Sequence, residues 1–272
     1  MIHETTKILF AGEGGQGVQT IAEVTAALAI GKGYNATYIP YFGVEQRGAS
    51  SIAYVIISKG TIYYPRFDDA DIIVVMRERA LKDIKRFITP NTDVIFDSST
   101  IEAKDIHKIA TKTIGFPGSK YALTKFGAKS YNLLVLGVIG NYLGFDKTEL
   151  WENVFEKLKS KFKSKEIEEK NKLALEFGAK IVLEKGEYSK AEFKADLGDK
   201  LYRNKEREGI IKPSLCKGCL ICVEKCPVGA LSKGSEVGFF GANIPDLNIE
   251  KCITCGICKR FCPDGAVAVE KR

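Results

Sequence analysis

The chain has 272 residues, of which 45% are hydrophobic and 28% charged, as is typical of a globular protein. Its formal charge of +7 comes from lysine spread along the chain, without the arginine-rich block typical of nucleic-acid binding. No apolar run approaches the roughly 18 residues that predict a transmembrane helix. Neither a nucleic acid nor a membrane is therefore expected as a partner.

The length suits one large domain followed by a small one. The first ten residues, MIHETTKILF, include an acidic side chain and lack the apolar stretch of a signal peptide. We therefore expect a cytoplasmic protein. The abundance of Lys, Glu and Ile favours a thermophile as the source of the protein.

A strand, a glycine turn and a helix are predicted at the start of the chain. Ile8–Ala11 form a short apolar run, and apolar side chains recur at helical spacing from Ile21 to Leu28. The turn between them has the sequence GEGGQG, in which the candidate binding residues are Gly12, Gly14, Gly15, Gln16 and Gly17.

This turn matches the pattern G-x-G-x-x-G of dinucleotide-binding folds. The acidic residue expected about 20 positions later, which would bind the ribose, is missing, and the nearest acid is Glu45. Nicotinamide binding is therefore disfavoured. Two interpretations stay open: amides at the helix N-terminus bind a phosphate or carboxylate, or the glycines serve only strand–helix packing.

Alternating strands and helices continue through the first two hundred residues. Runs rich in Val and Ile predict strands, and an amphipathic segment at 77–88 predicts a helix. This alternation indicates a three-layer α/β/α domain. Further strands are expected at 37–41, 50–58, 70–76 and 92–99, and further helices at 131–145, 146–162 and 166–185.

The segment YFGVEQRGASS, residues 41–51, joins two of these strands. Glycines frame charged residues in it, as is typical of a loop that faces a ligand or partner. Its candidate residues are Glu45, Arg47 and Gly48. A solvated loop without a function is the alternative.

The last 57 residues contain all eight cysteines, in two runs of the pattern C-x2-C-x2-C-x3-C-P. In two-cluster ferredoxins the first three cysteines of a run hold one [4Fe-4S] cluster and the fourth holds the other. The spacing therefore predicts crossed ligand sets. Cluster I takes Cys216, Cys219, Cys222 and Cys262, and cluster II takes Cys252, Cys255, Cys258 and Cys226.

Zinc and disulfides are the alternatives for these cysteines. Zinc ribbons usually have paired C-x2-C knuckles rather than two runs of four. The segments VGAL and DGAV follow the two runs at matching positions and indicate an internal duplication. Gly218 and Gly256 are expected where a side chain would crowd a cluster. The domains predicted are an α/β domain at 1–185, a charged linker at 186–211 and an α+β two-cluster ferredoxin domain at 212–272.

Several motifs together resemble one family. GEGGQGV at the first turn, FGVEQRGASS after the second strand and ADIIVVM resemble the gamma subunit of 2-oxoacid:ferredoxin oxidoreductases. Gly43, Glu45, Arg47 and Gly48 match the family's loop, in which Ala49 stands where glycine is frequent. The cysteine-rich tail resembles the delta subunit, so the whole chain resembles a gamma–delta fusion.

The resemblance implies a multisubunit enzyme of anaerobes that forms acyl-coenzyme A from a 2-oxoacid. Partner alpha and beta subunits would hold thiamine diphosphate, Mg and a further [4Fe-4S] cluster. Electrons would pass through the two clusters of this chain to an external ferredoxin, and the gamma part would lie near the coenzyme A approach. Pyruvate is the expected substrate; 2-oxoisovalerate, 2-oxoglutarate, an aryl 2-oxoacid and oxalate are alternatives.

No catalytic residue is predicted in this chain itself. Its two histidines, His3 and His107, have no neighbouring pattern of a catalytic triad. Two other functions stay open: a stand-alone iron–sulfur carrier with a ligand-binding α/β domain, and a nicotinamide-dependent reductase that feeds the clusters.

Overall fold

The computed structural model describes residues 2–42, 50–162, 164–181, 184–185 and 197–272. The chain divides into two compact units, Met1–Phe193 and Lys194–Arg272. A sheet in the order β2–β3–β1–β4–β5–β6–β7 forms the middle of the first unit. Its strands are β1 (Thr5–Glu13), β2 (Asn35–Phe42), β3 (Ser50–Ser58), β4 (Ile72–Val75), β5 (Asp93–Asp97), β6 (Lys112–Phe116) and β7 (Glu184–Lys185).

Four adjacent strands of this sheet, β1, β4, β5 and β6, run parallel to one another. The β3 strand pairs antiparallel with β1 and β2, and β7 pairs antiparallel with β6. Connections from β1 and β4 leave towards opposite edges of the sheet, so their carboxyl ends meet at a topological switch point. Ligands of open α/β folds are bound at such points.

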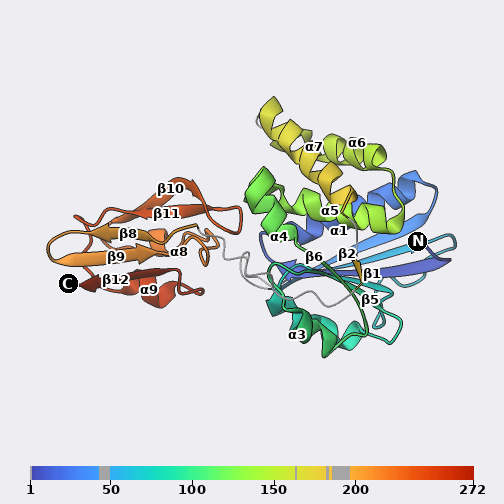
Figure 1. Ribbon diagram of the computed structural model, residues 1–272, viewed down its shortest axis with the longest axis horizontal. Coiled ribbons are helices and arrows are strands. Elements are labelled where there is room, and N and C mark those ends of the chain that lie inside the picture. Colours follow the sequence, from blue (N-terminus) through green and yellow to red (C-terminus); the bar gives the residue numbers. More distant parts are fainter. Residues whose placement is uncertain (1, 43–49, 163, 182–183, 186–196) are drawn as a thin grey trace. The chain divides into compact units, whose positions relative to one another are not determined.

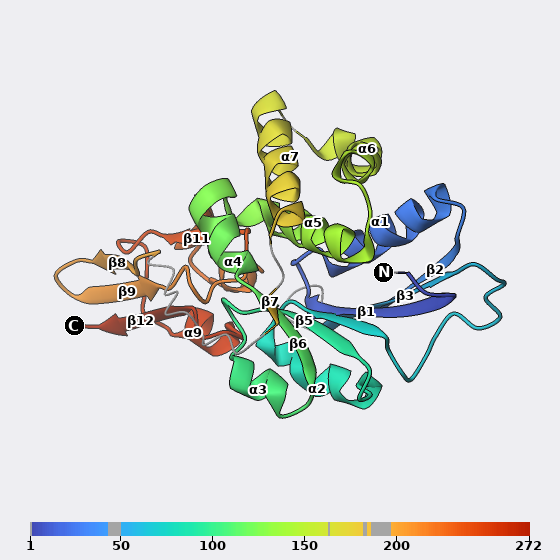
Figure 2. The same ribbon diagram turned by 45° about the vertical axis from the view of Figure 1, so that its right-hand side comes forward.

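Helices cover both faces of the sheet, as Figures 1 and 2 show for the first unit. One face is covered by α1 (Val18–Gly31), α5 (Tyr131–Leu143), α6 (Lys147–Leu158) and α7 (Lys165–Ala179). The opposite face is covered by α2 (Leu81–Ile84) and α3 (Ala103–His107). The short α4 (Gly118–Tyr121) follows β6. The predicted three-layer α/β/α architecture is confirmed.

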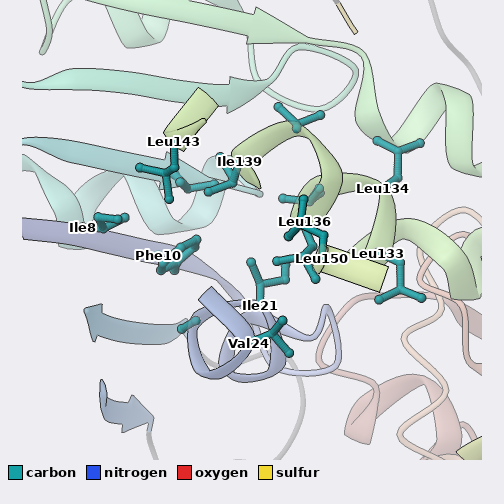
Figure 3. Packing of buried hydrophobic residues seen from close by; sticks show 14 of the residues in the cluster. Ile8, Phe10, Ile21, Val24, Leu133, Leu134, Leu136, Ile139, Leu143 and Leu150 are labelled. Atoms are coloured by element: carbon teal, nitrogen blue, oxygen red, sulfur yellow. The ribbon is translucent and has the colours of Figure 1, made fainter. Parts of the chain in front are cut away.

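Alternate residues of each central strand point to different cores. Ile8 and Phe10 of β1 pack with Ile21 and Val24 of α1 and with α5, as Figure 3 shows. Leu9 belongs to the opposite core. Because both faces are buried, the strand sequences are almost continuously apolar, as expected for parallel strands.

The second unit is built from short elements. A three-stranded sheet has the order β12–β9–β8, and β10 pairs with β11. Its elements are β8 (Lys200–Arg203), β9 (Arg207–Ile211), α8 (Ile221–Glu224), β10 (Leu231–Val237), β11 (Asn243–Leu247), α9 (Ile257–Phe261) and β12 (Val267–Lys271). This confirms an α+β architecture for the cysteine-rich part.

Part of the predicted linker is folded. The linker was expected at 186–211, but β8 and β9 form a hairpin within it. The Asn204 side chain closes the turn by accepting from the amides of Glu206 and Arg207, at 3.0 and 2.9 Å. Ile211 is fully buried in the core of this unit. Residues 186–196 lie outside the described residues.

Two predicted helices are shorter than expected. Segment 77–88 contains only α2 between two 3₁₀ turns, rather than one continuous helix. The helix expected at 166–185 ends at Ala179, and Glu184–Lys185 pairs with β6 as a strand. The run Ile181–Leu183 has the apolar, β-branched composition of a strand. None of the helices in the described part of the chain has the length and apolarity needed to cross a bilayer.

Candidate functional site

The glycine turn lies at the carboxyl end of β1, at the switch point of the sheet. Gly15 and Gly17 have positive φ angles of 99° and 78°, a conformation that glycine adopts without steric cost. Gly17 directly precedes α1, and no side chain caps that helix. The first-turn amides of α1 are thus left to other partners, as at anion-binding helix ends.

Other glycines of the turn allow close packing. A Cβ atom at Gly12 would lie 2.8 Å from Oε1 of Gln16 and 2.9 Å from Val18. A Cβ atom at Gly17 would lie 2.8 Å from Cβ of Asn132, on α5. These contacts support the packing role for Gly12 and Gly17. Gly15 is exposed, and a Cβ atom there would meet nothing within 4 Å.

The Gln16 side chain points inward and fixes the turn. It is 8% exposed. Its Oε1 accepts from the Glu13 amide at 2.8 Å, and its Nε2 donates to the Met76 carbonyl at 3.3 Å. Gln16 therefore ties the end of β1 to the residue after β4 and is engaged inside the protein. Gly14 and Gly15 are left as the candidates that face a ligand.

A buried polar cluster, Asp97, Ser119 and Tyr131, lies at the carboxyl ends of β5 and β6. Asp97 is fully buried and accepts from the Ser119 amide at 2.9 Å and its hydroxyl at 2.5 Å. Burial, and secondarily the negative charge of Asp97, raises the pKa of Tyr131 well above its usual value. The Tyr131 hydroxyl donates to the Met76 carbonyl at 3.4 Å.

This polar cluster shares the Met76 carbonyl with Gln16 and so braces the same edge of the sheet. Its residues come from three separate segments of the chain, so the sequence alone does not predict this cluster. The sequence feature that points to this cluster is Asp97 at the end of a buried strand, followed by Ser98 and Ser99. Glu45, Arg47 and Gly48, together with Gly43, lie outside the described residues.

None of the eight cysteines forms a disulfide bond. Within the described residues, no group of three or more His, Cys, Asp or Glu side chains is arranged to hold a single metal ion. A [4Fe-4S] cube is larger than one ion, and its thiolate ligands lie correspondingly farther apart.

Two cysteine loops have the same backbone course. Each has a positive φ at the second and fourth positions after its first cysteine: Gly218 and Leu220 in one loop, Thr254 and Gly256 in the other. Gly218 and Gly256 therefore occupy different positions in their loops. Each loop carries one glycine and one residue for which positive φ is costly.

Cys262 lies near the first cysteine run rather than its own. Burial and the neighbouring Cys219 and Cys262 raise the pKa of the Cys216 thiol. Burial, followed by the thiols of Cys216, Cys219 and Cys262 and lastly that of Cys258, raises the pKa of Cys222 to about 12. The three larger thiol contributions come from the other cysteines of the predicted cluster I.

The cysteines of the predicted cluster II are grouped in the same way, with Cys226 of the first run near the second run. Burial, followed by interactions with Cys252, Cys255 and Cys226, raises the pKa of the Cys258 thiol. The sulfurs of Cys226 and Cys262 each accept a backbone amide at 3.2 Å, from Ala230 and Ala266 respectively. Thiols grouped in fours, with amides directed at sulfur, fit the requirements of [4Fe-4S] clusters.

Comparisons with known proteins match both units. Residues 7–181 match the family "Pyruvate ferredoxin/flavodoxin oxidoreductase", and residues 215–267 match "4Fe-4S dicluster domain". The chain is 30% identical to the pyruvate/ketoisovalerate oxidoreductases common subunit gamma of Thermococcus kodakarensis, over 65% of this chain and 98% of that one. It is 30% identical to the 2-oxoglutarate synthase subunit KorC of Archaeoglobus fulgidus, over 50% of this chain and 70% of that one.

Some similar proteins are much longer. The ketoisovalerate oxidoreductase subunit VorA of Methanothermobacter thermautotrophicus is 30% identical to this chain. The aligned part is 64% of this chain and 35% of VorA. A solved 2-oxoglutarate:ferredoxin oxidoreductase from Magnetococcus marinus has a TM-score of 0.59 at 23% identity, over 65% of this chain and 31% of that one. The pyruvate oxidoreductase subunit PORC from Thermotoga maritima has a TM-score of 0.53 at 19% identity, over 65% and 96%. These structural similarities support the fold.

Proposed function

Because the chain belongs to the pyruvate ferredoxin/flavodoxin oxidoreductase family, we propose that it is a fused gamma and delta subunit of a 2-oxoacid:ferredoxin oxidoreductase. This proposal rests on two features that occur together in one chain. A gamma-type α/β unit is followed by two sets of four free cysteines.

In the proposed reaction, a 2-oxoacid and coenzyme A give acyl-coenzyme A, carbon dioxide, one proton and two electrons, which reduce two ferredoxin molecules. Decarboxylation takes place on partner alpha and beta subunits that hold thiamine diphosphate, Mg and a further [4Fe-4S] cluster. We propose pyruvate as the substrate. The names of similar proteins also include ketoisovalerate and 2-oxoglutarate, so the substrate panel below includes both. We place the complex in the cytoplasm.

The second unit provides two ligand sets for [4Fe-4S] clusters, which transfer single electrons when bound. We assign Cys216, Cys219, Cys222 and Cys262 to one set and Cys226, Cys252, Cys255 and Cys258 to the other. The amides of Ala230 and Ala266 donate to the fourth cysteine of each run. Such amide donors stabilise negative charge on sulfur and thereby favour the reduced form of a cluster.

We propose that the glycine turn of the first unit contributes to binding coenzyme A. Gly15 is exposed, and the adjacent α1 has no side-chain cap. Backbone amides at a helix N-terminus bind phosphate, of which coenzyme A carries several groups. The Gln16 and Tyr131 hydrogen bonds to the Met76 carbonyl hold the turn in position.

Purification from the native cell tests the proposed function. The chromosomal gene receives an affinity tag, and the protein is isolated without oxygen beside a tagged unrelated protein as control. We expect two larger chains and thiamine diphosphate to co-purify, and a substrate panel with coenzyme A to identify the oxidised 2-oxoacid. Isolation of a lone iron–sulfur protein would instead support a stand-alone electron carrier.

A further inference from the structure

The internal duplication allows the surroundings of the two cysteine sets to be compared position by position. Corresponding residues of the two runs are separated by the same interval, so Cys216 corresponds to Cys252 and Ala230 to Ala266. Five of these positions differ in charge: Lys217/Ile253, Val223/Lys259, Glu224/Arg260, Lys225/Phe261 and Val228/Asp264. Among their charged residues, Glu224, Lys225, Lys259 and Arg260 are exposed, whereas Lys217 and Asp264 are not.

In one half these two positions form an ion pair. Nζ of Lys217 lies 2.8 Å from Oδ1 of Asp264, with side chains only 8% and 15% exposed. The Lys217 ammonium also lies 5.6 Å from the centre of the Phe240 ring. Little water is therefore left to screen this pair.

The corresponding positions of the other half carry no charge. They are Ile253 and Val228, which are 53% and 39% exposed. The duplicated fold thus does not require an ion pair at these positions. The pair is a feature of the Cys216 side alone.

The charges lie beside the ligands proposed for cluster I. Lys217 directly follows Cys216, and Asp264 stands two residues after Cys262. Coulombic effects are several times stronger at buried positions than in water.

We propose that the buried charges of Lys217 and Asp264 tune the reduction potential of cluster I, in opposite directions, and leave that of cluster II unchanged. The proposal rests on the crossed ligand sets assigned above. Reduction adds one electron to a cluster. The Asp264 carboxylate therefore disfavours reduction of cluster I, and the Lys217 ammonium offsets this effect. Cluster II, beside Ile253 and Val228, has neither charge.

The test is a redox titration of the anaerobically purified full-length chain, followed by electron paramagnetic resonance. We expect Lys217→Met to lower one of the two midpoint potentials and Asp264→Asn to raise that same midpoint. The other midpoint should stay unchanged in both variants. Lys217→Arg, which keeps the charge, should retain the wild-type values. Ile253→Met, the matched control in the other half, should also leave both midpoints unchanged.

Equal shifts of both midpoints, or no shift in variants with full iron content, would overturn the proposal. If either single variant fails to assemble its clusters, the double variant Lys217→Ile/Asp264→Val supplies the same apolar pair as the other half. We expect its cluster I midpoint to differ from that of the single variant that does assemble, because the second charge is removed as well, and equal midpoints would count against the proposal. Absence of [4Fe-4S] clusters from the wild-type chain would overturn the proposed function instead.

Discussion

Two exposed glycines, Gly15 and Gly33, share a backbone conformation but lie at opposite ends of α1. Both have positive φ, 99° and 83°, and neither would place a Cβ atom within 4 Å of another group. Substitution therefore imposes similar backbone strain at both positions. The proposed site includes only Gly15. Comparing substitutions at these two glycines therefore distinguishes the effect of backbone strain from an effect on ligand binding.

We predict that Gly15→Val raises the KM for coenzyme A in the assembled complex by about tenfold, as expected for roughly 1.4 kcal/mol of lost binding. The added side chain would keep phosphate away from the turn amides. Steady-state kinetics against coenzyme A would measure this effect, with Gly33→Val as the control. Equal KM values in the two variants would remove the turn from the binding site.

A second prediction at this scale concerns the crossed cysteines. In Cys262→Ala, we expect anaerobic alkylation followed by mass spectrometry to show increased labelling of Cys216, Cys219 and Cys222. These residues share the cluster that loses a ligand. Cys226→Ala should instead increase labelling of Cys252, Cys255 and Cys258. If each variant exposes the cysteines of its own run, the ligand sets are not crossed.

Individual residues differ in how far the sequence predicts them. The spacing of the cysteines is sufficient to propose both ligand sets, because the pattern has a known geometry. The inward orientation of Gln16 is not predictable in the same way, since it depends on the Met76 carbonyl 60 residues away. The ion pair between Lys217 and Asp264 likewise requires the two runs to meet in space.

At the scale of elements, α5 and α7 cross closely because each carries a glycine at the contact. A Cβ atom at Gly137 would overlap the Leu175 carbonyl oxygen, and one at Gly178 would overlap the Leu134 carbonyl oxygen. Backbone is therefore packed directly against backbone. A methyl group at either position would force the helices apart.

We predict that Gly137→Ala and Gly178→Ala each lower the free energy of unfolding by about 1–3 kcal/mol, the usual cost of overpacking. The control is Gly31→Ala at the end of α1, where a Cβ atom has open space and φ is not positive. Thermal unfolding followed by circular dichroism would measure these changes. Wild-type melting temperatures in all three variants would contradict the packing described.

The elements of the first unit were predictable where an apolar run or helical spacing was clear, as in β1, α1 and α5. The β8–β9 hairpin was missed because its strands are short and rich in charge. The sequence feature that indicates this hairpin is Asn204, because Asn favours turns. It lies between two short segments in which apolar and polar residues alternate. The end of α7 was missed because an apolar run after Gly178 fits a helix and a strand equally well.

At the scale of the whole molecule, the two units have different sources of stability. The first unit has large apolar cores on both sides of its sheet. The core of the second unit includes Cys222, Cys252 and Cys258, with Cys226 and Cys262 packed against it. We expect so small a core to gain much of its folding free energy from the proposed clusters.

We predict that removing iron with an oxidant and chelator destabilises the second unit selectively. Hydrogen–deuterium exchange should lose protection in β9 and β12 and keep it in β1, β4 and α5. Mass spectrometry of the full-length chain before and after treatment would measure both units at once, so that the first unit serves as an internal control. Retained protection in β9 and β12 would show that these strands fold without clusters.

In the proposed function, this chain conducts electrons from a 2-oxoacid through two [4Fe-4S] clusters. The most direct measurement mixes the anaerobic native complex with pyruvate and coenzyme A, freezes it and records electron paramagnetic resonance, with other 2-oxoacids tested in parallel. We predict signals from reduced clusters that diminish in the complex carrying Cys262→Ala. If no tested 2-oxoacid reduces these clusters, while dithionite does, this chain does not lie on the electron path.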